Sequence, residues 1–262
     1  MSTQSEEAES STNQNAAEKN ERKRKRREKE REKFKEKKKR KLASVNEAHL
    51  EGSITEKPPH DLSEYLSAMQ AKTFSKMSAI ELGDMQIPVD SIADTSIWTG
   101  PRTLDNLVDL IIKVLPSLRL RLSQRSKASG APTLLFIAGA ALRVVDVTRV
   151  LKDKKLRGEK GGEVAKLFAK HFKLAEHVTY LRRTKVGSAV GTPGRIGKLL
   201  CETDALTVSA LSHIILDVSF RDAKKRNMLD IPETRDEVFK TVLGAPKVLQ
   251  AIREGKIQVV LF

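Results

Sequence analysis

"TLLFIAGAALRVVDVTRVLK", residues 133–152, decides the fold of this 262-residue chain. Thr133–Ala138 is a short apolar run of the kind that a strand buried on both faces requires. A turn of small residues from Gly139 to Ala141 follows, and then an apolar stripe with helical spacing that ends near Lys152. A strand that leads directly into a helix is the unit from which parallel sheets are built.

The same strand-and-helix pattern recurs along the chain. We expect further strands in residues 187–192, 211–219 and 256–262, and helices in 61–70, 103–118 (with Thr103 as N-cap), 163–175, 193–202, 231–244 and 246–255, with a loop at 126–132. Alternation of this kind predicts an α/β domain with a mostly parallel sheet covered by helices on both faces. Such sheets bind ligands at the carboxyl ends of their strands, so function is expected near Gly139 and Thr192.

Charge divides the chain into a tail, residues 1–45, and a domain, residues 46–262. Residues 1–20 are polar without apolar periodicity, which predicts disorder. Residues 21–41 hold 15 Lys and Arg against 5 Glu, with spacings that permit a solvated helix. Their clusters "KRKRR" and "KKKRK" resemble a nuclear or nucleolar address that also binds RNA phosphates without specificity. A charged solubilising tail is the alternative.

The rest of the chain is basic as well. The formal net charge is +15, and residues after 41 carry +8 of it. This favours a polyanionic partner such as nucleic acid. The single Cys201 excludes an internal disulfide and a multi-cysteine zinc site, and a reducing compartment is expected. No apolar run reaches the roughly eighteen residues of a membrane span, and no secretory signal is recognisable, so an intracellular soluble protein is expected.

The turn "GTPGR", residues 191–195, has the pattern of an anion site. Thr192 suits the N-cap and Pro193 the first helical position. Free backbone amides and the positive end of the helix dipole are then expected to face outward near Gly194. Arg195 adds a forked charge that can hold a phosphate diester from the side. An ordinary capped helix with a surface arginine is the alternative that the residues leave open.

The residues of a nucleotide hydrolase are missing. No G-x-x-x-x-G-K-[ST] loop occurs in the sequence. Asp217 ends an expected strand, but Val218 follows where magnesium would need a second carboxylate, so Asp217 is predicted to be a strand-end cap or a salt-bridge partner. His171, His177 and His213 lack the spacing of metal ligands or of a catalytic base and are expected to be structural or on the surface. No catalytic residue, metal or cofactor is predicted.

Three stretches resemble the DEAD-box RNA helicases. "VGTPGR", residues 190–195, resembles their TPGR motif, which holds the RNA backbone in the first of two RecA-like domains. "LTVSALSHIILDVSFRD", residues 206–222, resembles the strand leading into the D-E-A-D motif, with Asp217 in the first position and uncharged residues in the other three. "LLFIAGAALRVVDVTRVL", residues 134–151, resembles the P-T-R-E-L-A segment. The resemblance implies a single RecA-like domain without the magnesium-binding and water-activating carboxylates.

Together with the charged tail, this combination resembles the Cms family of nucleolar proteins of the small-subunit processome. The resemblance covers about residues 60–262. It implies a non-enzymatic pseudo-helicase of the nucleus and nucleolus, in an early small-subunit pre-ribosomal complex that processes pre-rRNA. The implied partners are pre-ribosomal RNA or snoRNA and pre-ribosome assembly proteins, without membrane association.

The expected RNA contacts lie around the TPGR turn. They are Thr192, Gly194, Arg195 and Lys198, with Arg143, Arg221, Lys224, Lys225 and Arg226 as further candidates. Contacts of this kind go to the RNA backbone, position the protein and read little sequence. Two alternatives remain: a protein-docking scaffold in the same complex whose RNA is contacted only by the tail, and a residual ATP-dependent RNA helicase.

Overall fold

Five parallel strands form the sheet on which the domain is built. The structure is a computed structural model that describes residues 53–124 and 127–262. The strands are β1 (Leu134–Ile137), β2 (Glu163–Leu167), β3 (Val186–Gly191), β4 (His213–Leu216) and β5 (Gln258–Leu261). They lie in the order β2-β3-β1-β4-β5, and every pairing is parallel. The carboxyl ends of all five strands therefore lie at one edge of the sheet.

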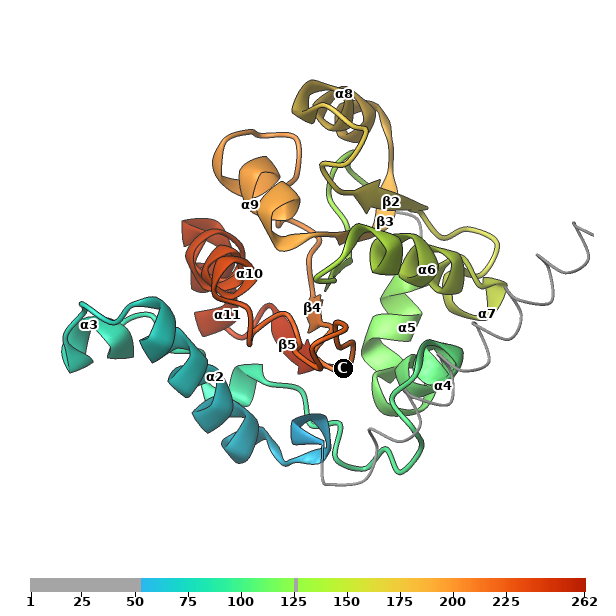
Figure 1. Ribbon diagram of the computed structural model, residues 1–262. Helices are drawn as coiled ribbons and strands as arrows, with labels where there is room; N and C mark the ends of the chain where they lie inside the picture. Colours follow the sequence, from blue (N-terminus) through green and yellow to red (C-terminus); the bar gives the residue numbers. More distant parts are fainter. Residues whose placement is uncertain (1–52, 125–126) are drawn as a thin grey trace, which may run out of the picture. The chain divides into compact units, whose positions relative to one another are not determined.

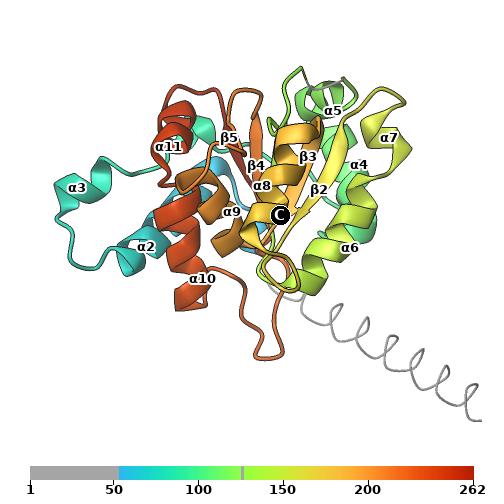
Figure 2. The same ribbon diagram turned by 90° about the horizontal axis from the view of Figure 1, so that it is seen from above.

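Helices cover both faces of this sheet (Figure 1). One face carries α2 (Pro59–Thr73), α8 (Leu174–Arg183), α9 (Pro193–Cys201), α10 (Pro232–Glu237), the π-helical segment η4 (Val238–Val242) and α11 (Pro246–Arg253). The other carries α4 (Leu104–Val114), α5 (Pro116–Leu122), α6 (Ala141–Leu151) and α7 (Lys154–Arg157). Figure 2 shows the same two layers from above. The short elements η2 (Ile54–Glu56), α3 (Ala79–Gly83) and η3 (Val89–Ser91) complete the described chain.

Neighbouring residues of one strand point into two different cores. In β1, Leu135 and Ile137 pack with α2, α8, α9 and α11, whereas Leu134 and Phe136 pack with the helices α4 to α7. The ring of Phe136 meets that of Phe262 edge to face, with centroids 6.1 Å apart. Because both faces are covered, β1 is a continuous apolar run, as the sequence suggested, whereas β3 includes the buried Ser188 and β4 begins with the buried His213. The predicted fold class, an α/β domain with a parallel sheet under helices, is confirmed.

The helix predicted over residues 163–175 is wrong for all but its last two residues, because residues 163–167 form a strand and residues 168–173 form a loop. Glu163–Leu167 is the edge strand β2, and α8 begins only at Leu174. The stretch has apolar residues at spacings that fit both a helix and a half-buried strand, so local periodicity does not decide between them. Pairing with β3 decides: Ala165 aligns with Ala189, and Val164, Ala165 and Leu167 are buried.

Two predicted helix boundaries differ in detail. The helix predicted over 103–118 is interrupted at Leu115, because Pro116 lacks the amide that would continue α4 and instead opens α5. Thr103 lies at the N-cap position, but its side chain makes no capping hydrogen bond and accepts one from Asn106 Nδ2 at 3.1 Å. The predicted tail, residues 1–45, lies outside the described residues.

A glycine lets α9 approach the following helical layer closely. Gly197 lies against Thr241 of η4, whose hydroxyl bonds to the carbonyl of Glu237 at 2.6 Å. A Cβ atom at position 197 would overlap the side chain of Thr241. One turn later, Cys201 Sγ is 3.4 Å from the carbonyl of Thr241. The small residues of "PGRIGKLLC" are thus used in helix packing within the chain.

Gly197→Ala is expected to lower the free energy of unfolding by about 1–3 kcal/mol, because α9 and η4 must separate to admit the methyl group. Chemical denaturation followed by circular dichroism measures this. Gly83→Ala is the matched control, since nothing lies within 4 Å of a Cβ atom placed there. That variant should be unchanged or more stable by up to about 1 kcal/mol. Equal effects of the two substitutions would contradict the close packing.

Candidate nucleic-acid interface

The TPGR turn lies where β3 ends and α9 begins, at the carboxyl edge of the sheet. Thr192 has the extended backbone of an N-cap (φ −79°, ψ 147°), and Pro193 opens the helix, as predicted. The side chain of Thr192 makes no capping hydrogen bond, and among the described residues its hydroxyl has no partner. Thr192 is half-buried, so this hydroxyl is available at the surface beside the helix start.

The amide of Gly194 interacts with a carboxylate of the chain itself. The carboxylate of Glu237, at the end of α10, accepts a hydrogen bond from this amide. Burial raises the pKa of Glu237, while the bond from Gly194 and the charge of Lys198 act against that rise. A Cβ atom at position 194 would overlap the same carboxylate, so the contact requires glycine. The expectation of a free amide at Gly194 is therefore wrong. Nothing in the local sequence indicates Glu237, which lies 43 residues further along the chain.

Arg195 points into the domain rather than outward. The residue is only 8% exposed. Its Nη2 donates to the carbonyl oxygen of Phe172 at 2.8 Å, and its Nη1 lies 3.3 Å from Nδ1 of His177. The expected surface grip on a phosphate is thus not available to this side chain in the structure. Arg195 instead ties the first turn of α9 to the loop between β2 and α8.

His177 is held neutral by this arrangement. Burial and, to a smaller extent, the adjacent charge of Arg195 together lower its pKa to about 4, against the opposing charge of Glu176. Because a guanidinium only donates, Nδ1 of His177 acts as the acceptor. The ring of Phe172 stacks on the imidazole with centroids 5.4 Å apart and an interplanar angle of 29°. The predicted structural role of His177 is consistent with these contacts.

Arg143 and Asp217 form an ion pair where β1 and β4 end. Arg143 donates from Nε and Nη2 to the two carboxylate oxygens of Asp217, at 2.7 and 3.2 Å. The Asp217 side chain is fully buried and that of Arg143 is 14% exposed. The guanidinium also lies 5.0 Å from the ring centroid of Phe220. Asp217 is thus a salt-bridge partner, one of the two roles predicted for it, and Arg143 is its counter-ion.

All three lysines among the predicted RNA contacts face solvent. Lys198, on α9, and Lys224 and Lys225, in the turn after β4, are exposed. Lys198 is near enough to the carboxylate of Glu237 to influence its pKa. Within residues 53–124 and 127–262, none of the three has an ion pair. These lysines are the cations of the predicted set that remain available to a ligand.

The two predicted arginines of the same turn are bound within it. Arg226 donates to the carboxylate of Asp222 from Nε and Nη2, at 3.1 and 2.9 Å. Arg221 donates to the carbonyl of Lys225 at 3.0 Å and lies 3.8 Å from Asp230. Both arginines therefore form hydrogen bonds within the turn and stabilise its conformation.

The other two histidines considered in the sequence, His171 and His213, differ in burial. His213 is buried in β4, where burial lowers its pKa to about 4, and His171 is exposed. Over the part of the chain that the structure describes, no three His, Cys, Asp or Glu side chains are placed to hold a metal ion. None of the described helices is long and apolar enough to cross a membrane.

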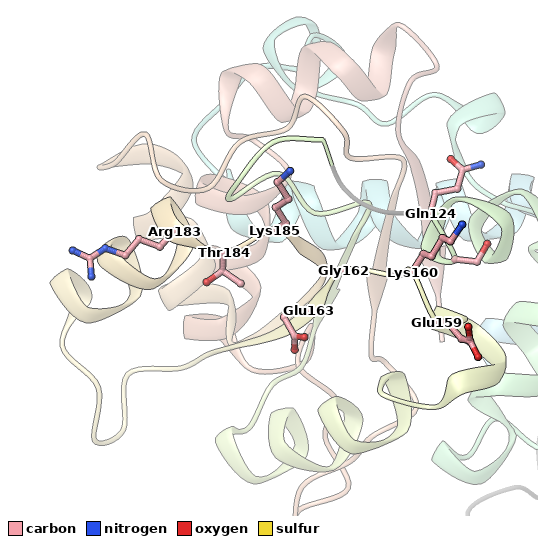
Figure 3. Close-up of a pocket in the computed structure, with 10 residues that line it drawn as sticks. Gln124, Glu159, Lys160, Gly162, Glu163, Arg183, Thr184 and Lys185 are labelled. Atoms are coloured by element: carbon pink, nitrogen blue, oxygen red, sulfur yellow. The ribbon is translucent and has the colours of Figure 1, made fainter.

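A hollow at the other edge of the sheet is distinct from this region (Figure 3). Its lining includes Gly162 and Glu163 at the start of β2, and Thr184 and Lys185 just before β3. These residues lie at the amino ends of the strands. The hollow therefore does not belong to the surface formed by the TPGR turn.

The chain can be compared with known proteins on this basis. The profile of the family described as "CMS1: U3-containing 90S pre-ribosomal complex subunit" matches residues 5–262. The chain belongs to this family. The predicted resemblance to the Cms family is thereby confirmed, and membership places the chain in ribosome biogenesis.

Relatives occur in fungi and animals. Protein CMS1 of Chaetomium thermophilum is 37% identical over 199 residues, which cover 76% of this chain and 77% of the relative. Protein cms1 of Schizosaccharomyces pombe is 34% identical, covering 78% of this chain and 70% of its own length. Human protein CMSS1 is 34% identical over 63% of this chain and 56% of its own length.

Solved structures similar to the domain include DEAD-box proteins. A DEAD-box protein from Methanococcus jannaschii gives a TM-score of 0.38 at 18% identity, over 62% of this chain and 37% of that one. A structure of Saccharomyces cerevisiae dbp5 bound to nup159, gle1, IP6 and ADP gives 0.40 at 16% identity, over 76% and 45%.

Asp217→Asn is expected to lower the free energy of unfolding by about 2–4 kcal/mol, because it leaves Arg143 partly buried without its counter-ion. The double change Arg143→Met/Asp217→Asn should cost less than the sum of the single changes, with a coupling of about 1–3 kcal/mol. Asp204→Asn is the matched control: its pair with Arg182 is also 2.7 Å long, but the side chains are 79% and 60% exposed. Loss of that pair should cost under about 1 kcal/mol. Additive single changes at 143 and 217 would contradict the coupling.

Proposed function

We propose that this family member is a non-catalytic, helicase-like RNA-binding assembly factor of the 90S pre-ribosomal complex. The observation that carries the proposal is the pairing of Asp217 with Arg143, at the strand end where catalysis would need a free carboxylate. We further propose nuclear and nucleolar location, with pre-ribosomal RNA or snoRNA and assembly proteins as partners. Family membership and the basic composition support these assignments.

The charges at the strand ends support a non-catalytic role. A phosphate-bound magnesium ion is held by carboxylates, usually one or two, together with the substrate. Asp217 has both carboxylate oxygens bonded to Arg143, and the residue after it is the buried Val218. A cation approaching Asp217 would have to displace a bidentate guanidinium. The site is therefore better suited to a fixed structural role than to a metal-dependent reaction.

RNA binding is supported by what the same edge leaves exposed. Lys198, Lys224 and Lys225 are exposed, and the hydroxyl of Thr192 is unpaired among the described residues. Lysines and hydroxyls at one edge are typical of contacts to phosphates, which position a protein without reading sequence. Arg195 contributes indirectly, because it fixes the loop next to this surface. Arg221, whose Nη1 donates within its own turn, holds part of this surface in place.

The tail-free domain, residues 46–262, is expected to bind single-stranded RNA with a clear salt dependence. Lys198→Gln/Lys224→Gln/Lys225→Gln should reduce both the affinity and the slope, by up to about 0.7 per lost phosphate contact. Fluorescence anisotropy across a salt series measures both quantities, after thermal unfolding has verified that each protein is folded.

The matched control changes three exposed lysines at the other end of the strands, Lys152→Gln/Lys154→Gln/Lys155→Gln. It removes the same charge, so any general electrostatic effect is equal in the two variants. Equal losses would contradict a specific surface. No binding by the tail-free domain would support the alternative, in which the domain docks on proteins and only the tail contacts RNA.

The enzymatic alternative has its own test. We expect no RNA-stimulated ATP turnover from the purified full chain, because Asp217 is neutralised and buried. A sensitive phosphate-release assay at high protein concentration, with and without single-stranded RNA, measures this. Turnover that rises with RNA and disappears in Asp217→Ala would establish a residual helicase-type activity instead.

A further inference from the structure

We infer that Phe172 is a stacking platform for an unpaired RNA base, presented by the loop between β2 and α8. This inference rests on the proposed RNA-binding function and adds a contact to bases rather than to phosphates. Sequence reasoning passed over Phe172, because it assigned residues 163–175 to a helix. The signal that could have indicated it is the alternation of lysine and aromatic residues in "FAKHFK", residues 168–173.

The loop presents an aromatic ring at the carboxyl edge of the sheet. Phe172 is 40% exposed, although its ring stacks on the imidazole of His177. The buried ring of Phe168 meets it edge to face, with centroids 5.4 Å apart and an interplanar angle of 82°. The ring is therefore supported by two aromatic neighbours while a large part of it stays accessible. An exposed aromatic on a supported loop is what base stacking requires.

Arg195 holds this loop at the start of α9. Its Nη2 donates to the carbonyl of Phe172 itself, and the arginine is almost fully buried. His171, which precedes Phe172, has a left-handed backbone conformation (φ 71°) that residues other than glycine rarely adopt. These restraints reduce the conformational freedom that binding would otherwise remove. Arg195 is thus a positioning residue that connects the phosphate-facing turn to the aromatic loop.

The charges around the ring favour a nucleic acid. Lys170 and Lys173 flank Phe172, both are exposed, and within the described parts of the chain neither forms an ion pair. Glu176, in the first turn of α8, accepts a hydrogen bond from the backbone amide of Lys173 at 2.9 Å. His177 beneath the ring is neutral near pH 7, since its pKa is about 4.

A nucleotide fits this chemistry better than an apolar protein surface does. Phe172 is the one large apolar side chain exposed in the loop 168–173, so the loop offers no continuous apolar patch. A ring between free lysines matches a ligand that combines a flat base with a phosphate. Aromatic stacking tolerates any base, so it would add affinity for single strands without sequence selection.

Ultraviolet crosslinking of the full chain to oligouridine, followed by mass spectrometry of the crosslinked peptides, tests the inference. The peptide is identified directly, so binding by the tail does not obscure the result. We expect uridine adducts on the peptide that contains Phe172. Phe172→Ala should reduce them about fivefold or more relative to adducts on tail peptides, as expected for the loss of one stacked base. The substitution keeps the carbonyl that Arg195 binds, and thermal unfolding verifies the fold.

The matched control is Tyr180→Ala, which removes an aromatic ring that is 39% exposed on α8. It should leave the adducts at Phe172 unchanged.

In Phe172→Trp, oligouridine should quench the added indole fluorescence, whereas an abasic strand of equal length should not. The wild-type chain contains only Trp98, so its change in fluorescence with RNA is measured separately and subtracted.

Three results would overturn the inference, and they differ in what they say about RNA binding. Adducts at Lys198 or at residues 224–225 without any at residues 168–173 would leave the proposed function standing and refute the stacking. Adducts confined to the tail would refute both. Equal quenching of Phe172→Trp by abasic RNA would show that the loop meets phosphates rather than bases.

Discussion

Burial of the parallel sheet on both faces is the constraint on which the other features of the domain depend. A strand covered on both sides has little room for charged side chains, so most of these lie where the strands end. Because all five strands are parallel, the turns after β1, β2, β3 and β4 meet at one edge. The ion pair of Asp217, the start of α9 and the loop of Phe172 are therefore neighbours in space although they are distant in sequence.

The charged groups at this edge are mostly satisfied by the chain itself. Asp217 forms an ion pair with Arg143, and the amide of Gly194 donates a hydrogen bond to Glu237. The guanidinium of Arg195 donates a hydrogen bond to the carbonyl of Phe172. A buried charge is costly unless it is paired and hydrogen-bonded. Asp217 and Arg143 meet this condition, whereas among the described residues Arg195 has no counter-ion and its buried Nε has no hydrogen-bond partner. These contacts connect the ends of the strands to the helices and loops that follow them.

Close contact between helices explains the glycines of the TPGR helix. Gly194 and Gly197 lie against Glu237 and Thr241, so the small residues that suggest phosphate approach are used for packing. The sequence of a motif such as TPGR shows which residue types are present and predicts that they lie at the end of a strand. It does not show whether a ligand or another helix of the same chain occupies the space that a missing side chain leaves.

The sequence alone determined the α/β class, the strands β1, β3, β4 and β5 and the start of α9 at Pro193, and it left two roles open for Asp217, between which the structure decided. Those features depend on apolar runs, on proline geometry and on the order of neighbouring residues, which are local properties. Only the tertiary structure decided that residues 163–167 form a strand, that Arg195 turns inward and that Glu237 caps Gly194. Each of these outcomes depends on a partner distant in the chain, and a buried polar group takes whichever partner the fold brings to it.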